Sequence, residues 1–244
     1  MEFEKLADVP LKLRFNLSVL DLVTFRRRSG DLDLTFFSAG NASEGIKLHK
    51  KIQSERPAEY IPEMPVSHEI ETEEFTLVIG GRIDGVFQYP DKPVIEEIKT
   101  TQHDPDSLEL SEDHRYWVQV KCYGYIYCLK YDLEIVTLQL TCCNIETGDI
   151  REIRKDFTLN SLREFFNPLV SNCIAHFRSV LDWEKCRDRK ITDLQFPFPE
   201  FRPGQREMAV RIYLSIRDKD HIIIQAPTGT GKTLGAIFPS VKAL

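Results

Sequence analysis

VIEEIKTT, residues 94–101, places two glutamates and a lysine inside a segment that otherwise predicts a buried β-strand. Side chains two positions apart in a strand point to the same face, so Glu97 and Lys99 share one face and Glu96 lies on the other. Burying such charges is costly unless they are paired or bind a metal ion. The neighbouring sequence has to supply whatever neutralises them.

The segment before it predicts a second strand of the same sheet. FTLVIGGRIDGVFQY (75–89) is rich in β-branched and aromatic residues, and PDKP (90–93) is a turn signal. The two strands are therefore expected to form an antiparallel hairpin that brings Asp84 close to Glu97. Glu96 is expected to face away, although a register shift of one residue would exchange the two glutamates.

Asp84, Glu97 and Lys99 together predict a small acidic site with a built-in cation. Neighbouring carboxylates repel unless a cation neutralises them, and Mg²⁺ prefers one or two carboxylates together with water and phosphate oxygens. Such a metal activates water for attack on a phosphodiester, while Lys99 orients or deprotonates that water or stabilises the developing negative charge. The alternative is a cross-strand salt bridge on a solvated face, the commoner explanation for an isolated E-x-K.

Two helical residue pairs point to the same chemistry. In EGIKLHKK, Gly45 and His49 lie on one helical face, where the imidazole can bind a metal and the glycine lets another element approach closely. In the helix after the lysine, Gln119 and Tyr123 have the same spacing and could orient a phosphate or the lysine. The alternatives are a surface histidine and ordinary helix residues within an aromatic core.

The remaining pattern predicts a mixed α/β core. Helices are expected at residues 15–32, 42–55, 111–130 and 158–186. Ser111 is expected to cap the third helix, and Pro168 to kink the fourth. Further strands are expected at residues 133–145 and 149–157. The predicted domain organisation is a domain at 1–186, a linker at 187–200 and a separate segment at 201–244.

The order GxxxH, GxxD, hhExK and QxxxY resembles the RecB-like branch of the PD-(D/E)XK nuclease superfamily over about residues 15–186. This resemblance implies a restriction-endonuclease-like mixed sheet flanked by helices. It also implies metal-dependent DNA cleavage, with exonuclease as the expected mode.

The same resemblance implies roles for individual residues. His49, Asp84 and Glu97 would bind Mg²⁺ or Mn²⁺ together with a backbone carbonyl near Ile98. Lys99 would be the catalytic lysine. The QxxxY residues, Gln119 and Tyr123, would support the site and contact DNA.

The cysteines argue against one feature of several RecB-like nucleases, a four-cysteine iron–sulfur cluster. None of the six cysteines precedes Cys122, and the later ones are not clustered, so we expect no iron–sulfur cluster but free buried thiols. DNA contacts would then come from local basic residues, for which a solvated charged face is the alternative. The candidates are Arg26, Arg27, Arg28, Lys47, Lys50, Lys51, Arg115 and Lys121.

The most specific motif is APTGTGKT, residues 226–233, between the apolar run HIIIQ and a predicted helix. In such a P-loop, glycines let backbone N–H groups surround a phosphate, the lysine reaches the β/γ-phosphates, and the threonine hydroxyl binds Mg²⁺. These residues are Gly229, Gly231, Lys232 and Thr233. HIIIQ is expected to be the strand that precedes the loop.

Together with FPFPEFRPGQREMA, the loop resembles the start of superfamily 2 helicases of the XPD/DinG type over about residues 196–244. The resemblance implies that Arg202 and Gln205 lie near the adenine of ATP. Such an ATPase also needs a distal acidic motif, an arginine finger and a whole parallel sheet. We therefore expect the N-terminal part of a longer nuclease–helicase, a truncated P-loop strand–loop–helix, and little ATPase activity without the rest.

Composition sets limits on these hypotheses. The chain has 244 residues, is 29% charged and carries a net charge of −6, which argues against overall electrostatic attraction to nucleic acid but does not exclude a local basic groove. The absence of a long apolar run or signal peptide predicts no membrane partner and a cytoplasmic location. The predicted partner is DNA, as single strands or duplex ends. Alternatives are a nucleic-acid-binding module with an inactive site, or an ATP-binding fragment with a scaffold domain.

Overall fold

The computed structural model describes residues 12–25, 39–90 and 92–243, without the side chains of residues 39–42. The chain divides into two compact units, residues 1–175 and 176–244, and each is considered separately. None of the described helices is both long and apolar enough to cross a membrane.

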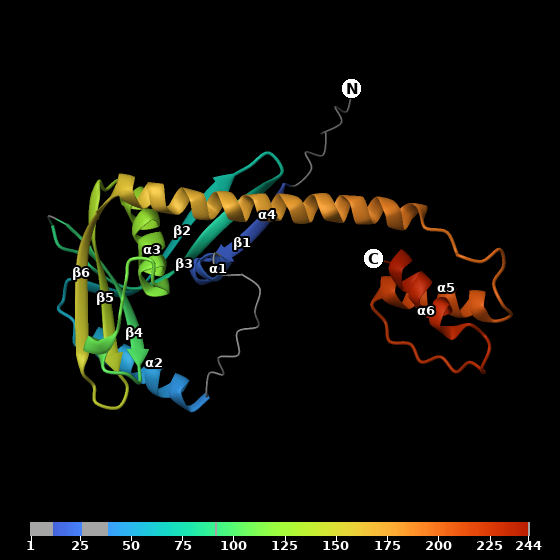
Figure 1. Cartoon of the computed structure of the whole chain (residues 1–244), viewed down its shortest axis with the longest axis horizontal. Coiled ribbons are helices and arrows are strands. Elements are labelled where there is room, and N and C mark those ends of the chain that lie inside the picture. Colours follow the sequence, from blue (N-terminus) through green and yellow to red (C-terminus); the bar gives the residue numbers. More distant parts are fainter. Residues whose placement is uncertain (1–11, 26–38, 91, 244) are drawn as a thin grey trace, which may run out of the picture. The chain divides into compact units, whose positions relative to one another are not determined.

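The first unit is built on a six-stranded mixed sheet (Figure 1). Its strands are β1 (Leu13–Ser18), β2 (Tyr60–Glu71), β3 (Phe75–Phe87), β4 (Val94–Thr101), β5 (Ile135–Asn144) and β6 (Ile150–Thr158). The order is β1-β3-β4-β5-β6, and β2 pairs with β3. The β1–β3 and β4–β5 pairs are parallel, whereas the other pairs are antiparallel. The predicted mixed α/β fold with a sheet flanked by helices is confirmed.

Helices pack on both faces of this sheet. They are α1 (Val19–Phe25), α2 (Ala39–Ser54), α3 (Arg115–Tyr131) and α4 (Leu159–Asp193), with a short 3₁₀ turn, η1 (Pro105–Ser107). On one face, Ile52 of α2 forms a buried cluster with Ile98 and Cys143. On the other face, α3 carries buried side chains, including Trp117, which has no exposed surface. Both faces of β4 are therefore covered, each by a different helix.

Two N-terminal assignments from the sequence are wrong. The predicted helix at 15–32 is strand β1 followed by a helix that begins at Val19, and residues 26–32 lie outside the described part. Pairing with β3 overrides the helical pattern here, because a strand is stabilised by its neighbour rather than by local propensity. Strand β2 was not predicted, since Pro62 and Pro65 interrupt it. Prolines are tolerated on a strand that pairs on one side.

Two helix boundaries also differ from the prediction. Helix α3 begins at Arg115, and the cap is His114, whose Nδ1 accepts from the Tyr116 N–H, rather than Ser111. Helix α4 continues through Pro168 and ends at Asp193, so the first residues of the predicted linker are helical. The division between the two units falls inside this helix.

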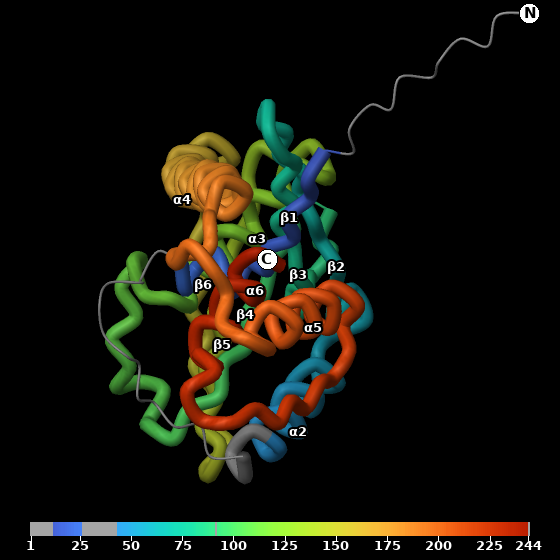
Figure 2. The backbone as a smooth tube through the Cα atoms, turned by 90° about the vertical axis from the view of Figure 1, so that its right-hand side faces the viewer, coloured from blue at the N-terminus to red at the C-terminus, as the bar shows by residue number. Residues whose placement is uncertain are grey.

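The second unit contains the C-terminal part of α4 and two shorter helices, α5 (Gln205–Asp218) and α6 (Lys232–Lys242). Helices α5 and α6 lie side by side (Figure 2), and a Cβ on Gly235 would come within 2.2 Å of the Met208 side chain. The predicted strand at 221–225 is wrong. This segment forms no ladder with a strand among the described residues, and Ile223 is fully exposed.

Candidate functional site

The candidate site lies where β3 and β4 separate. The ladder pairing of these strands ends at Gly85 and Glu96. Beyond this point the side chain of Asp84, rather than the main chain of β3, bonds to β4. Its Oδ2 accepts a hydrogen bond from the Ile98 N–H at 2.7 Å. The sheet therefore brings Asp84 to the level of Glu97 on β4, as the hairpin pattern predicted.

Glu97 and Lys99 point toward α3 from β4. Lys99 Nζ lies 2.6 Å from Glu97 Oε1 and donates to Gln119 Oε1 at 3.1 Å. It also lies 5.4 Å from the centre of the Tyr116 ring. Glu97 is 1% exposed, and its second oxygen, Oε2, is buried without a hydrogen-bond partner within the described chain. The lysine is thus fixed in position, while one carboxylate oxygen is left for another ligand.

The electrostatics of this group are those of a crowded acidic site. Burial raises the pKa of Glu97, and the nearby Asp84 carboxylate raises it further. Burial likewise raises the pKa of Asp84, although the Ile98 N–H and Lys99 act in the opposite direction. Burial lowers the Lys99 pKa, but Glu97 and Asp84 outweigh this effect and the net shift is upward. The lysine therefore stays charged, and a further cation would relieve the carboxylate repulsion.

Helix α2 brings His49 to the same place. His49 Nε2 lies 3.6 Å from Asp84 Oδ1, and burial lowers its pKa, which favours the neutral imidazole that binds metals. A Cβ on Gly45 would lie 3.0 Å from Thr100 Oγ1, so this glycine allows the close approach to β4 that the sequence predicted. Gln53, which the sequence gave no reason to select, donates to the Asp84 carbonyl oxygen at 2.8 Å.

Tyr123 supports β3 from α3. It is 5% exposed, and a Cβ on Gly81 would lie 2.7 Å from its hydroxyl oxygen. Burial and the Glu97 charge raise its pKa, so the hydroxyl remains protonated. These contacts correspond to the supporting part of the role predicted for Gln119 and Tyr123.

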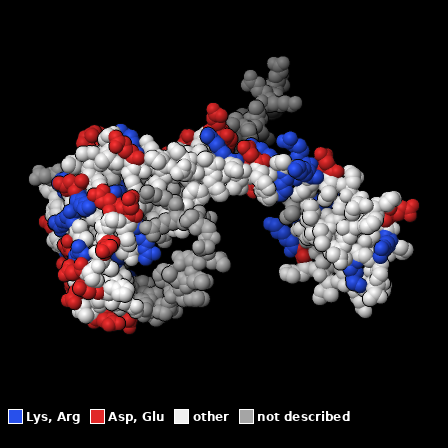
Figure 3. Space-filling model, viewed as in Figure 1, with Lys and Arg blue, Asp and Glu red and all other residues white. Residues whose placement is uncertain are grey.

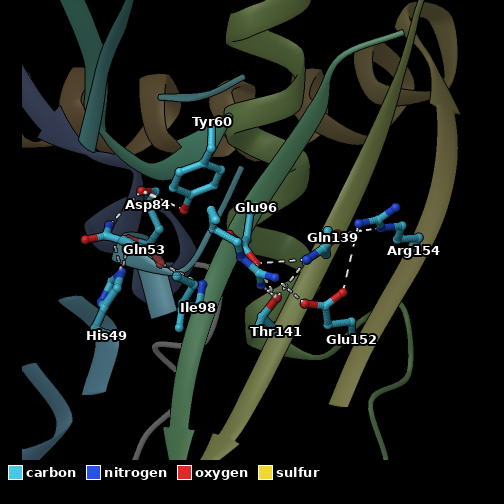
Figure 4. Close-up of polar contacts among 11 residues, drawn as sticks. His49, Gln53, Tyr60, Asp84, Glu96, Ile98, Gln139, Thr141, Glu152 and Arg154 are labelled. Atoms are coloured by element: carbon cyan, nitrogen blue, oxygen red, sulfur yellow. Dashed lines mark hydrogen bonds and ion pairs between the residues drawn. The ribbon is translucent and has the colours of Figure 1, made fainter. Parts of the chain in front are cut away.

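Glu96 lies on the opposite face of β4, as predicted, among polar residues that the sequence did not single out (Figure 4). Its Oε1 accepts hydrogen bonds from Arg56, which follows α2, and from Gln139 and Thr141 on β5. No short motif joins these residues to Glu96, because Arg56 and the two β5 residues lie on other segments of the chain.

The candidate basic residues fall into three groups. Arg26, Arg27 and Arg28 lie outside the described residues. Lys121 is 7% exposed and pairs with Glu112 at 3.1 Å, so the expectation that it contacts DNA is not supported by its position. Arg115 and the three α2 lysines are exposed. On the face shown in Figure 3, acidic and basic side chains are interspersed over the first unit.

In the second unit, the P-loop residues contact one another. Gly229 and Gly231 have φ angles of 84° and 73°, which favour glycine. Arg202 Nη1 donates to the Gly229 carbonyl at 2.7 Å, and Gln205 Nε2 donates to the Gly231 carbonyl at 2.9 Å. Lys232 Nζ donates to the loop carbonyl oxygens of residues 226 and 227, at 3.2 and 2.9 Å. The residues predicted to surround the nucleotide thus lie together.

Metal binding by the first unit depends on its carboxylates. Among the described residues, no three His, Cys, Asp or Glu side chains form a ready-made metal-binding group. Two carboxylates are nevertheless the donor set that Mg²⁺ uses together with water and phosphate oxygens, and Glu97 Oε2 is buried without a partner. Asp84 and Glu97 therefore fit a divalent cation whose coordination is completed by ligands from outside the protein.

Comparisons with known proteins relate part of the chain to a helicase. No family model matches the sequence. A solved structure described as "Crystal structure of SSO0001" is 19% identical, covers 64% of this chain and 75% of its own, and has a TM-score of 0.43. The probable ATP-dependent helicase MJ0942 of Methanocaldococcus jannaschii is 45% identical over 47 residues, or 19% of this chain and 7% of that protein. The chain is thus similar to a helicase over one short segment.

Proposed function

We propose that the first unit is a metal-dependent nuclease that hydrolyses DNA phosphodiesters, with exonuclease as the expected mode. The observation that supports this proposal best is the convergence of Asp84, Glu97 and Lys99 where β3 and β4 separate. The Glu97 carboxylate is buried, and the partly buried Asp84 carboxylate beside it raises its pKa further, which suits a cation site better than a structural salt bridge in which each charge would have its own partner.

Asp84 and Glu97 would hold Mg²⁺ or Mn²⁺, with His49 as a further ligand. When bound, the metal would activate water and stabilise the charge on the phosphate. His49 suits this role because burial keeps its imidazole neutral, and Gln53 fixes the main chain of Asp84. No other protein carboxylate is needed, because Mg²⁺ retains water and takes substrate oxygens.

Lys99 would act as a positioned positive charge. Its pKa is raised, so it is protonated at neutral pH and is a poor general base. Glu97 and Gln119 hold its amino group, which therefore needs little rearrangement to stabilise the negative charge that develops on a phosphodiester. This assignment selects the electrostatic role from the alternatives that the sequence left open.

We further propose that the second unit binds the phosphates of ATP as part of a nuclease–helicase. The support is the glycine-rich turn before α6, with Arg202, Gln205 and Lys232 gathered around it, and the short similarity to a probable helicase. In the whole protein, ATP-driven unwinding would deliver DNA strands to the nuclease.

Incubating the protein with linear and circular DNA, single- and double-stranded, in Mn²⁺, Mg²⁺ or EDTA tests the proposal. Cleavage is expected with either metal, on linear substrates first, and not in EDTA. Asp84→Ala should abolish it while leaving the circular dichroism spectrum unchanged. DNA binding without cleavage would favour an inactive binding module, and nucleotide binding alone would favour an ATP-binding fragment with a scaffold domain.

A further inference from the structure

Arg115, the first residue of α3, is an exposed cation that the proposed catalysis does not use. Other arginines of the first unit each pair with a carboxylate, namely Arg14, Arg56, Arg82, Arg151 and Arg154. Among the arginines that the structure describes in this unit, Arg115 and Arg163 have no carboxylate partner. An unpaired guanidinium is ordinary on a solvated surface, so its surroundings decide whether it serves a ligand.

Arg115 lies beside the site because it shares a contact with Lys99, the ring of Tyr116. The Arg115 Cζ lies 5.1 Å from the centre of this ring, and the Lys99 Nζ lies 5.4 Å from it. Both distances are within the range of cation–π contact. The Arg115 Nη2 also donates to the Tyr116 hydroxyl at 3.3 Å. The tyrosine thus joins an exposed guanidinium to the lysine that we place at the scissile phosphate.

The segment before α3 is fastened to the sheet and fixes where this helix begins. Arg151 Nη1 on β6 donates to main-chain carbonyl oxygens of the 105–108 segment, at 3.0, 3.2 and 3.1 Å. At the helix start, the His114 Nδ1 accepts from the Tyr116 N–H at 3.3 Å, and the two rings are 4.5 Å apart. The Tyr116 ring, and Arg115 against it, are therefore held in place by the fold.

Lys99 and Arg115 differ in how their charges are neutralised. The Lys99 Nζ has the Glu97 carboxylate at 2.6 Å, whereas Arg115 adds a second positive charge beside it without a carboxylate of its own. Like charges around one ring disfavour each other, and an anion bound beside them removes this cost. A guanidinium offers parallel N–H donors that match phosphate oxygens, and stacking on a ring fixes its plane. The arrangement therefore suits a phosphate.

We propose that Arg115, held on Tyr116, binds the DNA phosphate next to the scissile one and makes the site selective for a continuing strand. This inference rests on the proposed nuclease function, in which Lys99 faces the scissile phosphate. Since Lys99 lies within the site and Arg115 at its exposed edge, Arg115 meets the strand where it leaves the site. A substrate with a single phosphodiester gains nothing from Arg115, whereas a longer strand is bound more tightly.

The salt dependence of DNA binding tests this contact without reference to cleavage. Fluorescence anisotropy of a labelled single-stranded oligonucleotide in metal-free buffer gives the slope of log K against log salt concentration. Arg115→Met should raise the Kd about tenfold and reduce the magnitude of this slope by about 0.7, the amount for one phosphate of a single strand. Arg163→Met is the matched control, since it removes the other unpaired arginine, on α4, and should change neither quantity.

Variants of Tyr116 separate the ring from the charge. Tyr116→Phe keeps the ring and should bind DNA with nearly wild-type affinity, whereas Tyr116→Leu should weaken binding about threefold. Arg115→Met should then cost less affinity in Tyr116→Leu than in the wild type, because the effects of contacting residues are not additive. An unchanged slope in Arg115→Met, or an equal loss of affinity in Arg163→Met, would overturn the proposal.

Cleavage places the contact relative to the scissile bond. The substrate is an oligonucleotide with one neutral methylphosphonate linkage beside the first bond cleaved, on either side. On one side the modification should lower the wild-type kcat/KM about tenfold, whereas Arg115→Met should cleave modified and unmodified DNA equally well. Equal sensitivity of both proteins on both sides would contradict the assignment.

The two proposals fail in different ways. If the wild type binds DNA but neither binds Mn²⁺ nor cleaves, the proposed function fails, and the salt slope still decides whether Arg115 binds a phosphate. If the wild type cleaves DNA but Arg115→Met matches Arg163→Met in every measurement, only the role of Arg115 fails. A wild type that does not bind DNA overturns both.

Discussion

The P-loop and the β4 site differ in how their residues are brought together. The P-loop consists of eight consecutive residues, 226–233, and it is the most specific motif of the sequence. The β4 site takes His49 from α2, Asp84 from β3, Lys99 from β4 and Gln119 from α3, and each motif by itself is weak. The β4 site, although its motifs are weaker, is held by a six-stranded sheet. The P-loop lacks such support, because the predicted strand before it has no partner among the described residues.

The two lysines show what this support provides. Lys99 donates to the side chains of Glu97 on β4 and Gln119 on α3, so its amino group is held where the reaction is proposed. Lys232 donates to carbonyl oxygens of its own loop, and these bonds must break before it can bind a phosphate. A short motif specifies the chemistry, but packing specifies whether the groups are preorganised for it.

Removing the preorganised lysine should have the largest effect. Lys99→Met retains most of the side-chain volume and removes the charge, so the rate constant of DNA cleavage should fall about 100- to 1,000-fold. A steady-state assay in Mn²⁺ measures this fall. The control is Lys92→Met, which removes a half-buried lysine, paired with Asp156, from the turn before β4 and should cleave at the wild-type rate. Equal activity of both variants would break the comparison, because Lys99 would then be an ordinary salt-bridge residue.

The next effect concerns the sheet that assembles the site. Leu138 is fully buried on β5, and Leu138→Ala should lower the free energy of unfolding of the first unit by about 3 kcal/mol through the lost contacts and the cavity. Urea unfolding followed by the fluorescence of the buried Trp117, with the exposed Trp183 replaced by Phe, measures the change. A loss below about 1 kcal/mol would mean that the sheet does not limit the stability of the site.

The sequence predicted the β3–β4 hairpin correctly because its two strands are adjacent and joined by a clear turn. Strand β1 was missed because its partner β3 lies about sixty residues further on, and nothing local signals that pairing. Strand β2 was missed because its prolines argue against a strand, although one-sided pairing tolerates them.

The candidate site follows the same rule. Asp84, Glu97 and Lys99 were accessible through strand periodicity and a turn. Gln53 and Tyr60 were not, because a residue that holds a carbonyl oxygen leaves no motif in the sequence. Lys121 was misjudged for a related reason: charge alone does not reveal that an amino group is buried beside Glu112.

A third prediction uses the cost of the paired carboxylates. Glu97→Gln removes the repulsion with Asp84, so the metal-free protein should gain about 1 kcal/mol of stability at pH 8, while Mn²⁺ binding is lost. Burial and repulsion raise both folded-state pKa values, so protonation favours the folded state. The two carboxyl groups therefore contribute least to wild-type stability at a pH above their folded-state pKa values. Their contribution grows as the pH falls through these values.

Urea midpoints between pH 8 and pH 5 measure this dependence, with and without Mn²⁺. Between pH 8 and pH 5 the stability of Glu97→Gln should change much less with pH than that of the wild type. Mn²⁺ should stabilise only the wild type. If Glu97→Gln is instead destabilised in metal-free buffer at pH 8, then Glu97 stabilises the fold through Lys99, and the site is a structural ion pair.

The smallest effect is expected at the P-loop. To bind a triphosphate, Lys232 must leave two carbonyl oxygens and Arg202 must leave another, and each exchanged hydrogen bond costs roughly 0.5–1.5 kcal/mol. Binding of Mg·ATP should therefore be weak, with a Kd on the order of 1 mM, and 1 mM Mg·ATP should stabilise the second unit by only about 0.4 kcal/mol. Titration calorimetry measures the affinity directly, and Mg·AMP serves as the control without β- and γ-phosphates. Micromolar affinity for Mg·ATP would show that this loop is preorganised without a strand beside it, and would remove the contrast with the β4 site.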